Sequence, residues 1–398
     1  MMKRKSVRLL LTLGAVGALA PLSINAYLPA FPDVVRDLGT DMRDVQLTLA
    51  AFLAGLAIGQ PLYGSISDLY GRRSPLYAGL FLFSLASLGC AFALNIQTLI
   101  VFRFLQALGA CVGLVIPIAI VRDLFKQELM ARVLSRQVLI IGLASILAPL
   151  AGSQVLAWLG WRAIFWLLAA YATVCLAAVS LFLPERRTAN PAGSLRVGDV
   201  LRSYGQMLSD RRFVGYGLSG AAAHTAMFVY ITASPFILIE LYNVSALSYA
   251  WLFGLNAFGL VAASQLNARL LLRFRSEILI AHAGITQLVF AAWLLLVAAM
   301  PVGGLIGILV PLFGISGSLG FIQPNTISAA MADQAQRAAS ASALIGFLRF
   351  GMASVGGVLT CALFDGTARP MALLMAAFCL LSLLIRRVLL SRALAPVH

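Results

Sequence analysis

Charged residues are scarce in this sequence of 398 residues: they make up 11% of it, against 61% for hydrophobic residues. A soluble domain of this length needs a largely polar surface and cannot bury so much apolar surface in its core. The apolar residues form continuous runs of about 20 rather than alternating along the chain, which argues against a membrane β-barrel and predicts helices that span a bilayer. The composition therefore predicts an all-α membrane protein.

Features that enzymes and pumps require are also lacking. The sequence contains no Gly-x-x-x-x-Gly-Lys-Ser/Thr phosphate loop, which argues against an ATPase in this chain. The five cysteines lie inside apolar runs without metal-ligand spacing, and no nucleophile–base or paired-carboxylate constellation stands out. We therefore expect no enzyme activity, no metal and no cofactor. The net charge of +15 reflects basic residues that flank apolar runs, so nucleic acid is not an expected partner.

Twelve apolar runs are long enough to cross a membrane, and the basic residues between them predict their orientation. The runs are 9–31, 45–66, 75–95, 97–121, 136–158, 162–183, 213–240, 246–268, 278–299, 302–326, 340–364 and 370–390. Of the 29 Lys and Arg, 23 fall in the N-terminal segment, alternate loops and the C-terminal segment. Positively charged loops stay in the cytoplasm, so we expect a multi-pass protein of a bacterial inner membrane with both termini cytoplasmic.

The longest polar stretch between apolar runs divides the chain in two. We expect a six-helix bundle at 1–184, a cytoplasmic linker at 185–212 and a second six-helix bundle at 213–398. Two such halves, related by an axis along the membrane normal, are typical of secondary transporters.

The loop after the second run reads Gly-Ser-Ile-Ser-Asp-Leu-Tyr-Gly-Arg-Arg at 64–73. It resembles the signature loop of the major facilitator superfamily, Gly-x-x-x-Asp-x-x-Gly-Arg-Arg/Lys. The resemblance implies the major facilitator fold and a monomer. It also assigns Asp68, Gly71, Arg72 and Arg73 to a cytoplasmic gate, which Asp68 and Arg72 hold closed in the outward-open state.

Further motifs are similar to those of the bicyclomycin-resistance (Bcr/CflA) branch of twelve-span drug:proton antiporters. They are Pro-Leu-Ser-Ile-Asn-Ala-Tyr-Leu-Pro-Ala at 21–30, Arg-Phe-Leu-Gln-Ala-Leu-Gly at 103–109, Ala-Pro-Leu-Ala-Gly at 148–152, Trp-Arg-Ala-Ile-Phe-Trp at 161–166, Ser-Pro-Phe at 234–236 and Phe-Leu-Arg-Phe-Gly at 347–351. The resemblance places an antiporter motif at Pro149 and Gly152. It implies alternating access to a central site.

The sequence departs from this branch at Asn25. The branch has an aspartate there, to which the resemblance assigns proton and cation binding, whereas asparagine cannot titrate. Arg103 is predicted at a similar depth in the membrane, and an intramembrane arginine is a candidate functional residue. We expect Asn25 to accept a hydrogen bond from Arg103.

The remaining candidates are chosen for charge or aromatic character within the runs. Arg349 and His224 fall near the predicted bilayer midplane, and histidine titrates near neutral pH. The acidic residues lie in loops or near the ends of runs, and Asp33 is the carboxylate nearest the first run. The candidate substrate-binding residues are Asn25, Tyr27, Arg103, His224, Tyr230, Phe236 and Arg349. The candidate proton-coupling residues are Asp33, His224 and Arg103.

These observations favour a secondary transporter that exports small amphiphilic drugs or related compounds by proton antiport. The expected partners are the small-molecule substrate, protons and membrane lipid. Because no acidic residue lies deep in a run, we expect a preference for neutral or anionic substrates over lipophilic cations. An alternative stays open, namely an exporter or uniporter of an endogenous neutral or anionic metabolite without the usual proton coupling.

Overall fold

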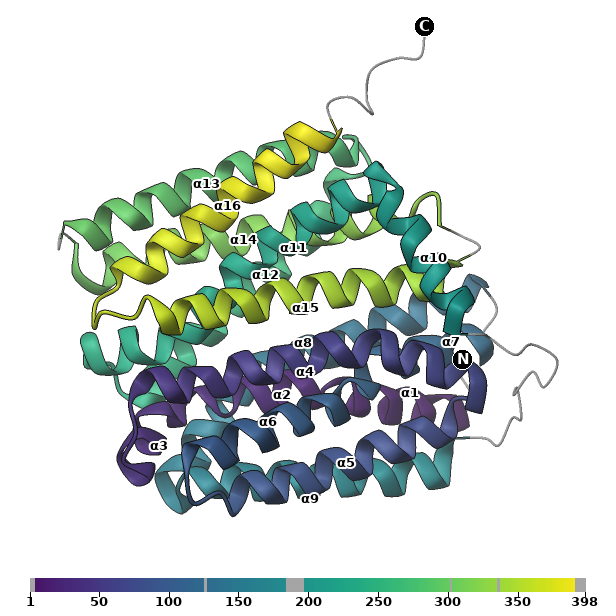
Figure 1. Cartoon of the computed structure of the whole chain (residues 1–398), viewed down its shortest axis with the longest axis horizontal. Coiled ribbons are helices and arrows are strands. Elements are labelled where there is room, and N and C mark those ends of the chain that lie inside the picture. Colours follow the sequence, from purple (N-terminus) through teal and green to yellow (C-terminus); the bar gives the residue numbers. More distant parts are fainter. Residues whose placement is uncertain (1–3, 125–126, 184–196, 301–302, 335–336, 391–398) are drawn as a thin grey trace, which may run out of the picture. The chain divides into compact units, whose positions relative to one another are not determined.

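The structure, a computed structural model, describes residues 4–124, 127–183, 197–300, 303–334 and 337–390. Within these residues the regular elements are all helices, and no strand occurs. The chain divides into two compact units, Met1–Val200 and Leu201–His398 (Figure 1). Part of the predicted linker, 185–196, lies outside the described residues. The rest includes helix α10 (Val197–Ser209), and its role as a linker stays a prediction.

The first unit is built from helices that match the first six predicted spans. In chain order they are α1 (Arg4–Gly17), α2 (Leu19–Asn25), the short 3-10 helix η1 (Leu28–Ala30), α3 (Phe31–Leu38), α4 (Met42–Tyr70), α5 (Arg73–Ala91), α6 (Ile96–Ala110), α7 (Val112–Leu124), α8 (Gln127–Leu159) and α9 (Trp161–Phe182). Helix α6 packs on α4 and α5, α5 packs on α9, and α1 packs on α8.

The second unit begins with the end of α10 and contains the helices of the last six predicted spans. They are α11 (Arg211–Ser234), the π-helical turn η2 (Pro235–Leu241), α12 (Ala246–Leu270), α13 (Ser276–Ala299), α14 (Gly304–Met331), α15 (Ala338–Ala362) and α16 (Arg369–Leu390). Helix α11 lies against α14, α15 and α16, while α13 packs on α14 and α16.

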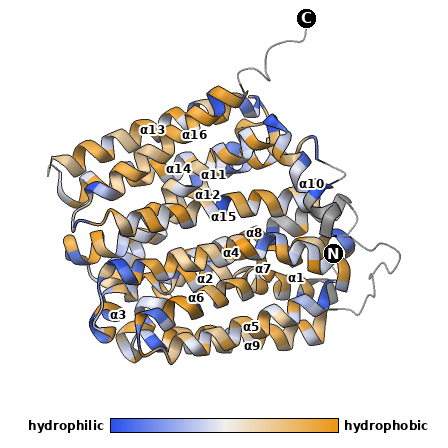
Figure 2. Ribbon diagram, viewed as in Figure 1, coloured by the Kyte–Doolittle hydropathy of each residue, from blue (hydrophilic) through white to orange (hydrophobic). Residues whose placement is uncertain are grey.

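Eleven stretches of the described chain are long and apolar enough to cross a membrane, and a twelfth is obtained if one bent pair counts as a single span. Figure 2 shows hydrophobic residues along the helices, with hydrophilic ones gathered mainly near helix ends and in the connections. The apolar sides of these helices face outward in many places, as Trp158, Val174 and Leu296 do with more than half of their surface exposed. In lipid such surfaces are solvated by hydrocarbon tails.

The bent pair is the first predicted span, which is not one continuous helix. Residues Arg8–Gly17 and Leu19–Leu38 meet at an angle of 42°. Proline has no N–H to donate to the carbonyl four residues earlier, so Pro21 leaves the carbonyl of Gly17 without its usual helical bond. Further along, Pro29 and Pro32 lie at the starts of η1 and α3. The span is therefore a series of short helices.

Two pairs of equivalent contacts reveal an internal repeat in the two units. Arg162, at the start of α9, donates to the carbonyl of Ala93 beyond the end of α5. Arg369, at the start of α16, donates to the carbonyl of Ala299 at the end of α13. In each unit, then, the arginine that opens the last span caps the third. This recurrence is what a duplicated transporter half predicts.

The second pair of contacts brings helix backbones together at glycines. A methyl group added at Gly55 on α4 would lie 2.5 Å from the carbonyl oxygen of Phe104 on α6. One added at Gly320 on α14 would lie 2.6 Å from the carbonyl oxygen of Leu260 on α12. Small residues at membrane helix contacts permit such close approach.

Candidate functional site

Arg103 is the largest side chain that is fully buried in the described chain, and it lies in the core of the first unit. Its Nη1 donates to the side-chain oxygen of Ser23 at 2.9 Å and to that of Gln106 at 2.6 Å. Gln106 in turn donates to Ser87 on α5. One guanidinium nitrogen thus links α2, α6 and, through Gln106, α5.

Aromatic rings surround the same guanidinium. Its central carbon lies 4.3 Å from the ring centre of Phe52, 4.8 Å from that of Tyr27 and 5.7 Å from that of Phe165. The negative face of an aromatic ring attracts a cation, more strongly where water is excluded. We call this cluster the Arg103 box; it comprises Ser23, Tyr27, Phe52, Arg103, Gln106 and Phe165.

The charge in the Arg103 box is incompletely satisfied. The Nε and Nη2 atoms of Arg103 are buried without a hydrogen-bond partner among the described residues, and no carboxylate there forms an ion pair with it. Unpaired buried charges are costly and are seldom retained for stability alone. Two guanidinium nitrogen atoms with unpaired N–H donors are suited to binding an oxygen atom of a ligand.

Asn25 does not accept a hydrogen bond from Arg103, contrary to the expectation from the sequence. Instead its side-chain nitrogen donates to the backbone carbonyl of Ser145 on α8, at 3.4 Å. The reason is Pro149, four residues further along α8. Because proline has no N–H, the Ser145 carbonyl has no helical donor, and the Asn25 amide supplies one.

Removing the Asn25 amide is expected to destabilise the protein. Asn25→Leu leaves the partly buried Ser145 carbonyl unpaired, which costs about 1 kcal/mol. In Asn25→Asp only the protonated carboxyl can donate, so we expect the stability of this variant to fall as pH rises. Thermal unfolding of the two variants at pH 5 and pH 8 checks this. A wild-type melting temperature for Asn25→Leu, or no pH dependence in Asn25→Asp beyond that of the wild type, would contradict the assigned contact.

Gly152, also part of the predicted antiporter motif, contacts the same part of the first span. It lies seven residues, or two helical turns, beyond Ser145 and therefore on the same face of α8. A methyl group added there would overlap the carbonyl oxygen of Ala26 and lie 2.8 Å from its Cα atom. The break between α2 and η1 is thus held by α8 through a side-chain hydrogen bond and a glycine contact.

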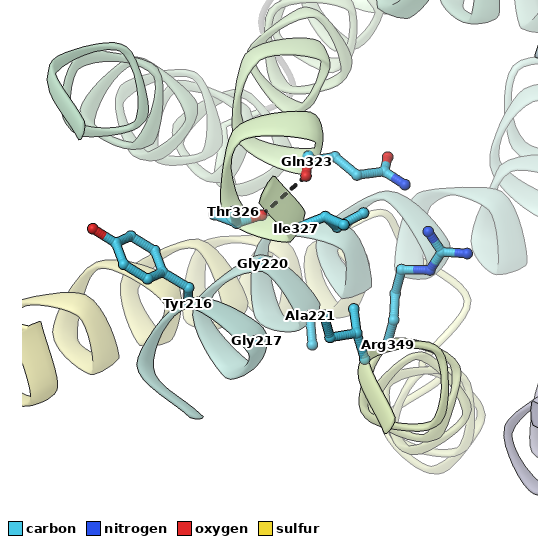
Figure 3. Close-up of a pocket in the computed structure, with 9 residues that line it drawn as sticks. Tyr216, Gly217, Gly220, Ala221, Gln323, Thr326, Ile327 and Arg349 are labelled. Atoms are coloured by element: carbon cyan, nitrogen blue, oxygen red, sulfur yellow. Dashed lines mark hydrogen bonds between the residues drawn. The ribbon is translucent and has the colours of Figure 1, made fainter. Parts of the chain in front are cut away.

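In the second unit, Arg349 borders a small hollow between α11, α14 and α15 (Figure 3). The hollow has a volume of about 10 Å³, enough for one water molecule at most. Figure 3 shows the Arg349 guanidinium and the Gln323 amide projecting to the same side, away from Tyr216. The lining residues are Tyr216, Gly217, Gly220, Ala221, Gln323, Thr326, Ile327, Ile345 and Arg349.

His224 and Arg349 belong to one aromatic row that joins α11 to α15. The His224 ring lies 5.0 Å from that of Phe228, which lies 6.3 Å from that of Phe350. The Arg349 guanidinium in turn lies 4.5 Å from the Phe350 ring. The Nδ1 atom of His224 and the Nε atom of Arg349 are buried without hydrogen-bond partners among the described residues. This second cluster therefore resembles the Arg103 box in combining unpaired nitrogen atoms with aromatic rings.

The other aromatic candidates of the second unit lie further along α11, for Tyr230, and in η2, for Phe236. Tyr230 is buried, stacks on Phe253 and has no hydrogen-bond partner for its hydroxyl among the described residues. Phe236 packs against Phe364 instead. It is twelve residues from His224, or about 18 Å along a helix. The structure therefore does not bring Phe236 together with His224 and Arg349.

The remaining candidates lie nearer the ends of the spans. Asp33, proposed for proton coupling, forms an ion pair with Arg36 on the same short helix, α3. In the signature loop, Gly71 adopts a positive φ of 78° at the end of α4, a conformation that suits glycine. Arg72 then donates to Asp123 on α7 at 3.0 Å, and Arg73 donates to the Ser180 carbonyl on α9. The side chain of Asp68 lies outside those described, so its role in the gate stays a prediction.

Several residues of the site were not predicted from the sequence. Phe52 and Phe165 contribute two walls of the Arg103 box, and Gln323 lines the same hollow as Arg349. Gln46 on α4 is buried with both side-chain polar atoms unpartnered among the described residues. The spacing of Arg103 and Gln106, three residues apart on a helix, is a signal that could have predicted their contact. The aromatic walls come from separate spans and carry no such signal.

Comparisons with solved structures show which fold this is. The chain is similar to the xylose transporter XylE from E. coli, with a TM-score of 0.76, 13% identity, and coverage of 99% of this chain and 98% of that one. It is also similar to a bacterial homologue of the human lysosomal transporter Spinster, with a TM-score of 0.74 and 15% identity over 99% of this chain and 98% of that one. At such low identity these likenesses concern the fold alone.

Sequence similarity to two relatives extends along nearly the whole chain. It is 34% identical to an uncharacterised MFS-type transporter, YdgK, of Bacillus subtilis, over 94% of this chain and 92% of the relative. It is 28% identical to a bicyclomycin resistance protein homologue of Haemophilus influenzae, over 96% of both. A chloramphenicol resistance protein of Pseudomonas aeruginosa is 32% identical over 67% of this chain and 62% of the relative.

These relatives support the predicted resemblance to the drug-efflux branch and confirm that the chain is a multi-pass membrane transporter and not an enzyme. The family model described as Major Facilitator Superfamily matches residues 13–357. The chain therefore belongs to the major facilitator superfamily.

Proposed function

We propose that this transporter exports small amphiphilic compounds across the inner membrane of a bacterium, with alternating access and in exchange for protons. The observation that carries the proposal is the Arg103 box. Its fully buried guanidinium has two nitrogen atoms without hydrogen-bond partners among the described residues, in the core of a transporter half. The names of relatives that match most of the chain, for resistance to bicyclomycin or chloramphenicol, support export of drugs. They do not favour the alternative of an uncoupled metabolite carrier.

The positive charges within the spans support a preference for neutral or anionic substrates. Arg103 and Arg349 are both cations, and neither forms an ion pair with a carboxylate in the described residues. Asn25, where the family branch has an acid, adds no negative charge. A permanent cation beside either arginine would meet a like charge without compensation, which is unfavourable at low dielectric constant.

Proton coupling then needs a titrating group other than Asn25. His224 is our first candidate, because its imidazole can accept a proton and its Nδ1 atom has no partner in the described chain. Asp33 is the second, and its ion pair with Arg36 would weaken when the carboxyl is protonated. We propose that Arg103 couples the two ligands, so that proton binding and substrate binding influence each other through this residue.

The experiment that tests this proposal measures transport of compounds that differ in charge. Purified protein in proteoliposomes with an imposed pH gradient is offered chloramphenicol, which is uncharged, an amphiphilic anion, and ethidium, a permanent cation. We expect gradient-dependent, saturable transport of chloramphenicol or the anion at a rate at least about tenfold above that of ethidium, because about 1.4 kcal/mol of repulsion suffices for that ratio. Faster saturable transport of ethidium would contradict the charge preference, and no transport of any compound would contradict the proposed export.

A further inference from the structure

A groove of about 410 Å³ lies on the second unit between α11, α13 and α16. Neither the family assignment nor the proposed transport site uses it. Its lining residues are Tyr216, Glu277, Ile280, Ala281, Ile285, Leu383, Arg386, Arg387 and Leu390. Helices α11 and α13 begin at this end of the unit and α16 ends there, so the groove lies at the boundary of the membrane-spanning region.

The floor of the groove is part of a packed core. Tyr216, Ile280 and Leu390 are buried and belong to one hydrophobic cluster with residues of α11, α14 and α15. Two glycines pack against leucine side chains of α16. A methyl group at Gly215 would lie 2.8 Å from Leu390, and one at Gly284 would lie 2.8 Å from Leu383. The floor of the groove is therefore closely packed.

One end of the groove is polar and the other is apolar. The polar end carries Glu277 on α13 together with Arg386 and Arg387 on α16. Ile285 lies eight residues beyond Glu277 on α13, or about 12 Å along the helix, and more than half of its side chain is exposed. The groove thus runs from charged residues near a helix end along an apolar surface that faces the membrane.

The charge at the polar end is positive, because two arginines lie there with one carboxylate. Neither Arg386 nor Arg387 forms a hydrogen bond or ion pair within the described part of the chain, whereas Glu277 lies 3.8 Å from Arg275 outside the groove. Arg386 is also partly buried against Tyr216 and its neighbours. Two unpaired arginines beside each other suit a phosphate group, which guanidinium groups bind through two or more N–H groups.

We propose that this groove binds one anionic phospholipid. Arg386 and Arg387 contact its phosphate, and an acyl chain lies along Ala281, Ile285 and Leu383. Basic pockets between membrane helices bind anionic headgroups, and the apolar length of this one requires a ligand with a hydrocarbon chain. A free phosphate would occupy only the polar end, and an uncharged or zwitterionic lipid would leave the two arginines without a net negative partner.

The test measures lipid binding by the full-length protein in detergent, with phosphatidylglycerol, phosphatidylcholine and inorganic phosphate as separate additions. Native mass spectrometry counts bound lipid, and thermal unfolding reports stabilisation. We expect the wild type to retain one phosphatidylglycerol in preference to phosphatidylcholine. We expect Arg386→Gln with Arg387→Gln to weaken that binding about 25-fold, since each arginine near a membrane surface contributes about fivefold.

Two further variants separate a specific site from general charge. Arg269→Gln with Arg273→Gln removes the same charge from exposed residues at the same end of this unit that do not line the groove, and should leave lipid retention unchanged. Ala281→Trp keeps both groove arginines but fills the apolar channel, and should reduce retention if the acyl chain lies there. Equal loss in the Arg269/Arg273 variant, equal binding of phosphatidylcholine, or the same stabilisation by inorganic phosphate would each overturn the proposal.

Discussion

Replacing Arg103 with methionine is expected to reduce transport by about 100-fold or more and, at the same time, to raise the melting temperature. Truncating a buried charge that pairs with a ligand typically costs 2–5 kcal/mol of interaction, and 100-fold corresponds to about 2.8 kcal/mol. The folded protein, by contrast, no longer has to desolvate a buried cation that lacks a carboxylate partner, and we expect this gain to exceed the loss of the hydrogen bonds to Ser23 and Gln106. Methionine packs well beside aromatic rings, so the walls of the Arg103 box should keep their contacts.

The opposite signs of these two effects distinguish a functional residue from a structural one. Transport in proteoliposomes and thermal unfolding of the same preparation measure them together. Arg202→Gln, which removes an exposed arginine from α10, serves as the control and should leave both quantities unchanged. If Arg103→Met transports normally, the Arg103 box is not part of the transport machinery. If it both unfolds earlier and fails to transport, the guanidinium is a structural tether through Ser23 and Gln106.

Gly152→Ala is expected to lower transport at least about tenfold and to destabilise the protein by about 1–3 kcal/mol, the usual cost of overpacking. The added methyl group would overlap backbone atoms of Ala26, which cannot move aside as a flexible side chain can. Separation of α8 from the first span at this point would also lengthen the Asn25–Ser145 hydrogen bond. Transport rates and melting temperatures of the variant check both effects.

A second glycine provides the matched control. Gly317 also lies within a membrane-spanning helix, α14, and a methyl group there would meet no atom within 4 Å. Gly317→Ala should therefore be neutral or slightly stabilising, because alanine favours the helix by about 0.5–1 kcal/mol. Equal losses in the two variants would mean that glycine flexibility, rather than close packing at Gly152, is what matters.

The fold followed from the sequence because its determinants are local. Runs of about 20 apolar residues predict spans, and the motif at 64–73 identifies the family, whose model matches residues 13–357. The prediction of the first span was the least accurate, because hydropathy carries no information on the bend near Gly17 or on the separate helices before and after η1. Those features depend on prolines and on packing against α8.

The site was only partly predictable, because its contacts join distant segments. Arg103 and Arg349 stand out as charges in apolar runs, and both proved to lie beside aromatic rings, with Arg103 fully buried and Arg349 partly buried. The partner of Asn25 was predicted wrongly. Its hydrogen bond to Ser145 depends on a carbonyl that Pro149 leaves free 120 residues away, and similar predicted depth in the membrane could not reveal that geometry.

The measurement that tests the account most directly is collapse of a pH gradient by substrate in everted membrane vesicles. Chloramphenicol, the amphiphilic anion and ethidium are added separately to vesicles that contain wild-type protein or Arg103→Met. We predict that chloramphenicol or the anion dissipates the gradient in wild-type vesicles and not in those with Arg103→Met. Movement of these compounds down their own gradient, with the pH difference unchanged, would contradict proton antiport and would identify Asn25 as the mark of an uncoupled carrier.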